Sequence, residues 1–355
     1  MTPIGISAPA DTRIARPATK PGAAARLGLS LGVGLAGGAV SWYFWTIPHT
    51  NPSDFAQLWA AARGFLQGVN PYEVVGPGRP FEWDFPLLYP LPAVVAAVPF
   101  ALLPLHLADA LFVGLGAAVL AWALTSRWLN NPQLAVFGSV AYLFALQLSQ
   151  WSPLLMGAAL LPGWGWLLAC KPTSAVAVFC GYPNRRVLIG AAAFGVVTAV
   201  LWPWWIRDWL AAVQTAAHMT PPILHTGGFI LLLAALRWRR PEGRVLLVLS
   251  CVPHTPVLYE VLPLFLIPRI IEEAALLAVL TYAVQFAVAA GAPYSDMAAQ
   301  MARMGEWTVW LVYMPALVLV LRRPNVAPQD DLVAATVARA RAVASGWWLA
   351  PSRSR

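Results

Sequence analysis

Charged residues are scarce in this chain of 355 residues: Asp, Glu, Lys and Arg together make up 11% of it. Soluble domains carry roughly 25% charged residues, so this composition excludes one. The chain is instead rich in apolar residues, with 59% hydrophobic residues, 18 Trp and a mean hydropathy of +0.65. The sequence therefore predicts a polytopic membrane protein.

Cysteine is also rare, and the motifs that usually hold metals are missing. Cys170, Cys180 and Cys251 lie in or beside apolar runs without CxxC spacing, which excludes a zinc knuckle and a disulfide framework. His218 and His225 have neither HExxH spacing nor a neighbouring carboxylate. No Asp-x-Asp motif occurs, which argues against a metal-held nucleotide-sugar donor. We expect no metal and no cofactor.

The basic residues exceed the acidic ones and give a net charge of +8. In a soluble chain this excess would suggest nucleic acid as a partner. Here the arginines stand between the apolar runs, as the positive-inside rule requires of a membrane protein. We therefore expect membrane lipids as partners, and no nucleic acid.

A membrane helix needs about 20 apolar residues. Candidate runs occupy residues 27–47, 86–104, 107–125, 133–149, 152–169, 172–183, 187–204, 223–236, 244–253, 256–268, 273–290 and 306–321. Three of them are too short to cross alone, and many of the 32 prolines interrupt apolar segments. Broken backbone at membrane depth is tolerated only where it lines a cavity or is buried in protein. We expect an all-α polytopic transmembrane bundle of about 10–12 membrane helices, with a cavity open to the outside.

The positions of the arginines predict the topology. If the N-terminus is inside, the basic clusters all fall on the cytoplasmic side: Arg185-Arg186, the arginines from 237 to 244, Arg269 and Arg322-Arg323. The acidic loop 49–85 and the loop 205–222 then lie outside. We divide the chain into a cytoplasmic N-terminal tail (1–26), one membrane-embedded domain (27–321) and a cytoplasmic basic tail (322–355). The basic tail either rests on an anionic leaflet or is disordered.

Asp54 stands in the acidic outer loop, directly before residues 55–66. In this segment apolar residues recur at helical spacing, which predicts an amphipathic helix on the membrane surface. Two roles are open for Asp54. It can cap the helix, with Gln57 completing a capping box, or it can be a general base at the cavity mouth that deprotonates an acceptor hydroxyl. A second carboxylate, Asp109, is expected to follow a cytoplasmic turn and to cap the third span.

The order of short motifs resembles a known family. These motifs are Asp54-Phe55, Gly68-x-Asn70-Pro71-Tyr72, Tyr89-Pro90, Ser149-Gln150, Lys171-Pro172 and the segment from His254 to Tyr259. Over residues 40 to 320 this set resembles the alpha-mannosyltransferase-like branch of the GT-C superfamily. Those integral-membrane glycosyltransferases take a sugar from a polyprenyl phosphate on the extracytoplasmic side. The resemblance implies a GT-C-like fold, Asp54 as the catalytic residue, a polyprenyl-phosphate sugar as donor and a lipid or glycan as acceptor.

Candidates for substrate binding follow from this resemblance and from their placement: Arg63, Tyr72, Tyr89, Gln150, Lys171 and His254. Lys171 is expected near the outer surface, where an ammonium can hold the donor phosphate; alternatively it snorkels at a helix end. Arg63 is a second phosphate candidate or a lipid-headgroup contact. His254 binds sugar or phosphate, or else satisfies a loop carbonyl. Tyr72 and Tyr89 stack on a sugar or serve as interfacial aromatics.

Three functions compete for this chain. The first is an inverting hexosyltransferase of the cell membrane, with mannose as the expected sugar. The second is a transporter or flippase, which would bury ionisable residues near the membrane midplane and often shows inverted repeats. The third is a non-catalytic subunit of an envelope-assembly complex. This last reading stays open because the chain has Tyr89-Pro90-Leu91 where the family has Tyr-Pro-Pro, and Ser149-Gln150 where it has Gly-Gln.

Overall fold

A computed structural model describes residues 22–47, 53–126, 131–215, 220–254, 257–291 and 297–327. Every regular element in these ranges is a helix, and the one pairing of extended backbone is an isolated bridge between Val75 and Phe81. The all-α prediction is thus confirmed. Most of both predicted tails, residues 1–21 and 328–355, lies outside the described residues.

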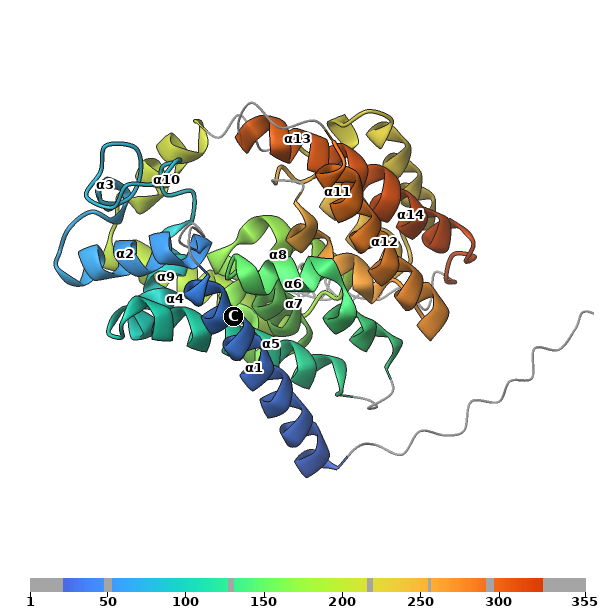
Figure 1. The fold of residues 1–355 in the computed structure, drawn as a ribbon, viewed down its shortest axis with the longest axis horizontal. Helices are drawn as coiled ribbons and strands as arrows, with labels where there is room; N and C mark the ends of the chain where they lie inside the picture. The colour runs from blue at the N-terminus through green and yellow to red at the C-terminus, as the bar shows by residue number, and fades with distance from the viewer. Residues whose placement is uncertain are drawn as a thin grey trace, which may run out of the picture.

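The helices follow one another with short breaks (Figure 1). The α-helices are α1 Ala23–Thr46, α2 Asp54–Leu66, α3 Pro71–Val74, α4 Leu91–Ala101, α5 Leu105–Leu124, α6 Val140–Gln147, α7 Ser152–Leu160, α8 Pro172–Gly181, α9 Arg185–Leu201, α10 Trp205–Val213, α11 Pro241–Cys251, α12 Ile271–Ala289, α13 Met297–Thr308 and α14 Met314–Leu321. The 3-10 helices are η1 Pro132–Gly138, η2 Pro162–Cys170, η3 Pro222–Leu224, η4 Gly228–Arg237 and η5 Leu258–Leu266, and a π-helical turn, η6 Val309–Tyr313, joins α13 to α14. Several elements begin with proline, which fits the first turn of a helix but cannot continue a preceding one.

Four helical segments of the described chain are long and apolar enough to cross a membrane: Ala23–Thr46, Leu105–Leu124, Ile271–Ala289 and Ala299–Leu321. A fifth is added if α9 and α10, which meet at a bend of 104°, count as one span. These helices make the chain compatible with a multi-pass membrane protein. The other apolar runs form shorter helices, such as α4, α8 and η4.

Helices α1 and α5 pack closely and run antiparallel. A Cβ added at Gly38 or Gly114 would lie 2.9 Å from a backbone oxygen of the other helix, so glycine is required for this approach. At one end of the pair Arg26 Nη2 donates to the carbonyl of Trp122, 2.8 Å away. At the other end Trp45 lies beside the first turns of α5, where its Nε1 donates to Asp109. The chain between α1 and α5 therefore leaves and re-enters at the same end of the bundle.

This arrangement corrects two predictions. The run 86–104 was expected to cross the membrane alone, but α4 has 11 residues and would span about 16 Å, well short of the ~30 Å hydrocarbon core. Asp109 was expected to cap a span on the cytoplasmic side. It is instead 1% exposed within α5 and accepts a hydrogen bond from Ser53, next to Asp54. Asp109 and Asp54 thus lie at the same end.

Helix α2 is also placed differently from the prediction. It packs inside the protein against α4 and α5: Phe55 is 1% exposed and its ring stacks on Phe112 at 4.3 Å between centroids. The N-cap position belongs to Ser53, whose side chain makes no cap hydrogen bond, and Asp54 is the first helical residue. The capping-box interpretation of Asp54 is therefore wrong, as is the surface placement, because Gln57 is buried as well.

The arginine clusters gather at the opposite end of the bundle. Gln133, after the C-terminal end of α5, donates to the carbonyl of Leu266. The neighbouring Ile267 carbonyl accepts from Arg323, and Arg323 also pairs with Glu273 at 2.5 Å. Arg269 pairs with Glu242 at 2.7 Å. The bundle therefore has an arginine-rich end and an end that carries Asp54.

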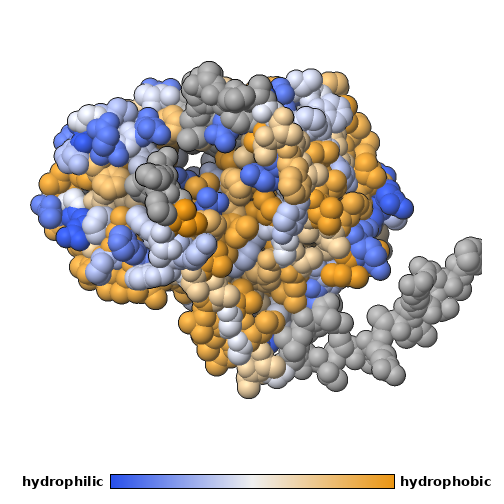
Figure 2. Space-filling model, in the orientation of Figure 1, coloured by the Kyte–Doolittle hydropathy of each residue, from blue (hydrophilic) through white to orange (hydrophobic). Residues whose placement is uncertain are grey.

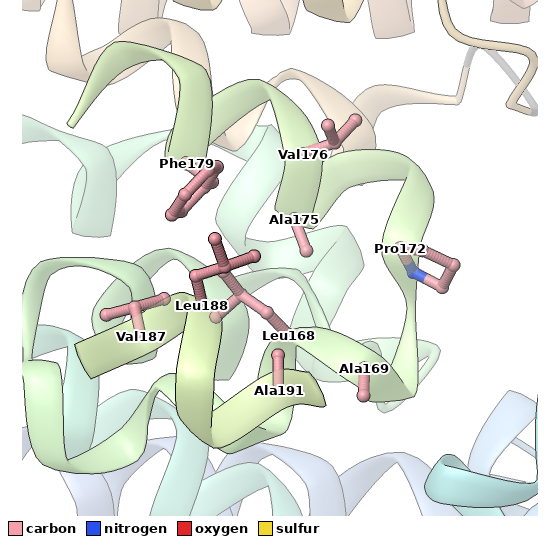
Figure 3. A pocket seen from close by; sticks show the side chains of 9 residues that line it. All are labelled: Leu168, Ala169, Pro172, Ala175, Val176, Phe179, Val187, Leu188 and Ala191. Atoms are coloured by element: carbon pink, nitrogen blue, oxygen red, sulfur yellow. The ribbon is translucent and has the colours of Figure 1, made fainter. Parts of the chain in front are cut away.

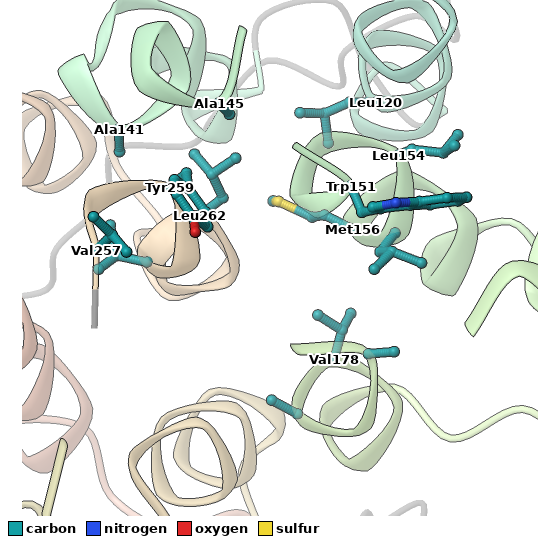
Figure 4. Close-up of a cluster of buried hydrophobic side chains, with 14 of the residues drawn as sticks. Leu120, Ala141, Ala145, Trp151, Leu154, Met156, Val178, Val257, Tyr259 and Leu262 are labelled. Atoms are coloured by element: carbon teal, nitrogen blue, oxygen red, sulfur yellow. The ribbon is translucent and has the colours of Figure 1, made fainter. Parts of the chain in front are cut away.

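The face of the molecule seen in Figure 2 is largely hydrophobic. In this view the surface is hollowed between the part that carries α3 and α10 and the part that carries α11 and α13 (Figures 1 and 2). The buried hydrophobic residues form one continuous core. In it Tyr259 and Leu262 of η5 lie near Ala141 and Ala145 of α6, and Trp151 lies beside Leu154 at the start of α7 (Figure 4).

Candidate functional site

Four polar side chains form one continuous chain of contacts at the end that carries Asp54. Gln150 Nε2 donates to Asp54 Oδ2 in a short hydrogen bond. The other side of the same amide, Oε1, accepts from Lys171 Nζ at 3.2 Å. Lys171 Nζ also pairs with Glu260 Oε1 at 2.5 Å. Because Gln150 and Glu260 are 3% and 2% exposed, these contacts form inside the protein.

The turn between α6 and α7 brings Gln150 to Asp54. Ser149 adopts a φ of 50°, the left-handed region that residues other than glycine enter rarely. This reversal lets the backbone N–H of Gln150 donate back to the carbonyl of Ala145 at 2.8 Å. The carbonyl of Leu148 accepts from the backbone N–H of Asp54 at 3.2 Å. The first residue of α2 is therefore fixed to this turn by its backbone as well as its side chain.

Lys171 lies in the break between η2 and α8. Pro172 follows it and opens α8, so the chain changes direction at the lysine. Its Nζ lies 5.2 Å from the ring centroid of Tyr259 and 5.9 Å from that of Tyr89, both within cation–π range. The ammonium is thus held between two aromatic rings and a carboxylate, which are contacts that offset the cost of burying a charge.

The carboxyl group of Asp54 has a raised pKa. Burial raises the pKa of Asp54 from 3.8 to about 6, although Lys171 and the hydrogen bond from Gln150 oppose the rise. The residue still keeps partial access to solvent. A carboxylate that is unprotonated at neutral pH and titrates near 6 is suited to accept a proton during a reaction.

Glu260 is a site residue that the sequence analysis missed. The available signal was a lone carboxylate inside the apolar run 256–268, since such residues are costly in an apolar segment and often functional. Its Oε1 pairs with Lys171, whereas its buried Oε2 has no hydrogen-bond partner among the described residues. An unsatisfied buried carboxylate oxygen is a position where a ligand hydroxyl could donate.

Tyr72 and His254 lie near these residues with contacts of their own. The Tyr72 hydroxyl donates to the carbonyl of Tyr89 at 3.2 Å, which fixes the loop that carries Tyr89. His254 is 3% exposed; its Nδ1 lies 2.8 Å from the carbonyl of Val252, and its Nε2 lies 3.3 Å from the hydroxyl of Tyr313. Burial lowers the pKa of His254. The contact with the loop carbonyl, one of the two roles left open for His254, is present.

Arg63 is not brought to the other candidates. It is exposed on α2, with its guanidinium 4.7 Å from the ring centroid of Trp59. It lies nine positions after Asp54 on the same helix, about 13 Å along the axis. Its position fits the lipid-headgroup contact better than a role beside Asp54.

An apolar pocket of about 280 Å³ lies between η2, α8 and α9 (Figure 3). It is lined by Leu168, Ala169, Pro172, Ala175, Val176, Phe179, Val187, Leu188 and Ala191. None of the four contacting polar residues lines it. Within the part of the chain that the structure describes, no group of three or more His, Cys, Asp or Glu residues could hold a metal ion.

Comparison with known proteins adds no relative: no family model, curated protein or solved structure matches the chain. The function must therefore be argued from the site itself.

Proposed function

We propose that this chain is a GT-C glycosyltransferase of the alpha-mannosyltransferase-like branch. It would move a sugar, with mannose as the expected one, from a polyprenyl-phosphate donor to a hydroxyl of a lipid or glycan on the extracytoplasmic face of the cell membrane. The observation that carries the proposal is the contact chain from Asp54 through Gln150 to Lys171. Three residues from separate motifs of the resemblance meet at one end of an all-helical chain with apolar spans.

The proposed reaction is a single displacement with inversion. The acceptor oxygen bonds to the anomeric carbon while the bond from that carbon to the phosphate oxygen breaks. The acceptor proton passes to Asp54, and the polyprenyl phosphate leaves with the bonding electrons. A base with a pKa of about 6 is largely unprotonated at pH 7 and retains enough basicity to assist a hydroxyl as it becomes acidic in the transition state.

Lys171 and Glu260 would hold the donor. An ammonium has three N–H donors, and among the described residues Gln150 and Glu260 use two of those on Lys171. The third can donate to a phosphate oxygen and stabilise the charge that develops on the leaving group. The free Oε2 of Glu260 can accept from a sugar hydroxyl, and the rings of Tyr89 and Tyr259 offer apolar faces beside it.

The conformation of Ser149 adds support for the resemblance. The family carries Gly-Gln at the place of Ser149-Gln150, and glycine enters the left-handed region without steric cost. The φ of 50° at Ser149 is a conformation of that kind. The family's glycine and this serine therefore fit the same turn, so the departure from the motif need not end activity.

The orientation belongs to the proposal as well. We place the arginine-rich end in the cytoplasm, with both termini there, because positive residues favour that side. The loop 49–85 and Asp54 then face outward. Of the ten to twelve membrane helices expected, four or five among the described residues are long enough to cross, and the run that forms α4 is not counted as a crossing.

Cysteine labelling tests this orientation. In a background without the native cysteines, Arg79→Cys should react with a membrane-impermeant maleimide in intact cells, because exposed Arg79 lies in the outer loop. Arg186→Cys is the matched control at the other end. It is also exposed and should react only after permeabilisation. The reverse pattern would place the termini outside and the site in the cytoplasm.

The function itself is tested with membranes from an overexpressing strain. They should transfer radiolabel from a polyprenyl-phosphate sugar to an extractable lipid or glycan, above membranes that carry the empty vector. The labelled product identifies the acceptor. Absence of transfer from every polyprenyl-phosphate hexose offered would end the proposal.

A transporter is the second candidate, because the Lys171–Glu260 pair is a buried ion pair of the kind that transporters keep inside their membrane segments. Reconstituted vesicles separate the two. A transporter would move labelled solute or lipid across the bilayer with its covalent structure unchanged, whereas a transferase would change the labelled molecule.

A further inference from the structure

A second buried carboxylate lies beside the candidate site without belonging to its contact chain. Asp109 accepts four hydrogen bonds: Ser53 Oγ donates to Oδ1 at 2.6 Å, and Trp45 Nε1, Ser149 Oγ and Ser41 Oγ donate to Oδ2 at 2.7, 2.8 and 2.9 Å. A carboxylate offers about four acceptor sites, so these donors match its capacity. The arrangement joins α1, the start of α2 and the turn before α7 to one residue of α5.

Two of the four donors directly precede residues of the site. Ser53 is the N-cap of α2 and comes before Asp54, and Ser149 comes before Gln150. Ser149 has a φ of 50°, which is sterically unfavourable for a residue with a Cβ. Its hydrogen bond to Asp109 stabilises that conformation. The same carboxylate therefore fixes both backbone segments whose side chains meet.

We infer that Asp109 is a positioning residue, which sets the placement of Asp54 relative to Gln150 and, through Gln150, relative to Lys171. The inference rests on the proposed function for its kinetic consequence. The structural part of the inference does not depend on the proposed function, because the contacts of Asp109 are present whatever reaction the protein catalyses. Asp109 makes no contact with the reacting atoms in this scheme and acts through its two serine neighbours.

The kinetic test compares Asp109→Asn with Ser41→Ala. The amide keeps the shape of the side chain but has one acceptor oxygen where the carboxylate has two, so it cannot accept from Ser53 on one side and from Trp45 and Ser149 on the other. We expect kcat to fall about 10- to 100-fold, as for a misplacement of catalytic groups by ~1 Å, with little change in KM for the donor. Ser41→Ala removes only the contact to α1 and should keep wild-type kcat. Equal losses in the two variants would mean that Asp109 merely holds α1 against α5.

If Asp109→Asn does not fold, Ser149→Ala tests the same inference. It removes one donor on the Gln150 side and leaves the carboxylate intact, so the loss of kcat should follow the same direction with unchanged KM. Wild-type kcat in this variant would overturn the inference.

A second measurement is independent of sugar transfer. A hydrophobic carbodiimide modifies protonated carboxyl groups, and mass spectrometry of the peptide that contains Asp54 reports its protonation as a function of pH. The charged groups that act on Asp54 are Lys171, which lowers its pKa, and Glu260 and Asp109, which raise it. Removal of the Asp109 charge should move the labelling midpoint to lower pH, and Ser41→Ala should leave it unchanged.

The two proposals can fail separately. A shifted midpoint in a protein that transfers no sugar would end the proposed function and keep the coupling of Asp109 to Asp54. Sugar transfer by the wild type, together with an unshifted labelling midpoint in Asp109→Asn, would keep the proposed function and end the coupling of Asp109 to Asp54.

Discussion

Replacing Asp54 by Asn should lower the rate of sugar transfer at least ~100-fold while the protein still folds and inserts, because general-base catalysis contributes about 10²- to 10⁴-fold. Asn keeps an oxygen that can accept from Gln150, so the contact seen in the structure can persist. It has no carboxylate to take the acceptor proton at neutral pH. The measurement is the initial rate with a radiolabelled polyprenyl-phosphate sugar, normalised to the amount of folded protein.

Asp84→Asn is the matched control for this change. Asp84 is an exposed carboxylate between α3 and α4 and has no place in the contact chain. Its variant should retain wild-type transfer. An Asp54→Asn variant that keeps more than about a tenth of the wild-type rate would show that Asp54 is not the base, given the ~10²-fold minimum expected of one.

The pH dependence of transfer gives a third check on the same carboxyl group. The reactive form is the unprotonated one, so kcat/KM should fall as the pH drops through about 6, the raised pKa of Asp54. Had the carboxyl kept its ordinary value of 3.8, the rate would stay level down to about pH 5. A profile without an acidic limb between pH 5 and 7 would contradict the assignment.

Part of this architecture could be read from the sequence. The apolar composition predicted an all-helical membrane protein, and the order of motifs placed Asp54, Gln150 and Lys171 in one site, where the structure brings them into contact. Single-residue motifs far apart in the chain are informative here because each lies at a break between helices. Breaks at the same end of a bundle meet in space.

Other features could not be read, for physical reasons. An apolar run does not tell a crossing helix from one packed inside the protein, so the run that forms α4 was counted as a span. That error moved Asp109 to the wrong end, because a counted crossing reverses the side assigned to the segment that follows it. The partners of Asp109 and Lys171 come from segments distant in sequence, and only the packing of the helices decides them.

Lys171→Met should abolish donor-dependent transfer, whereas Lys171→Arg should retain part of it, because arginine keeps a positive charge for the phosphate. The ion pair of Lys171 with Glu260, which the sequence did not predict, affects how Lys171→Met must be interpreted. Lys171 is the partner of Glu260, whose side chain is 3% exposed, so Lys171→Met leaves a buried carboxylate without its cation. Breaking a buried ion pair in this way costs about 3–5 kcal/mol. The single variant therefore mixes loss of stability with loss of binding.

The double variant Lys171→Met/Glu260→Gln separates the two effects. It removes both charges together, and replacing a whole buried pair is often neutral for stability. We expect the double variant to regain the thermal stability that Lys171→Met loses, as measured by the temperature at which the detergent-solubilised protein aggregates. Transfer should stay absent at every donor concentration, because no cation remains for the phosphate. Recovery of transfer along with stability would instead mean that Lys171 serves only to neutralise Glu260, and the phosphate would then have to be held elsewhere.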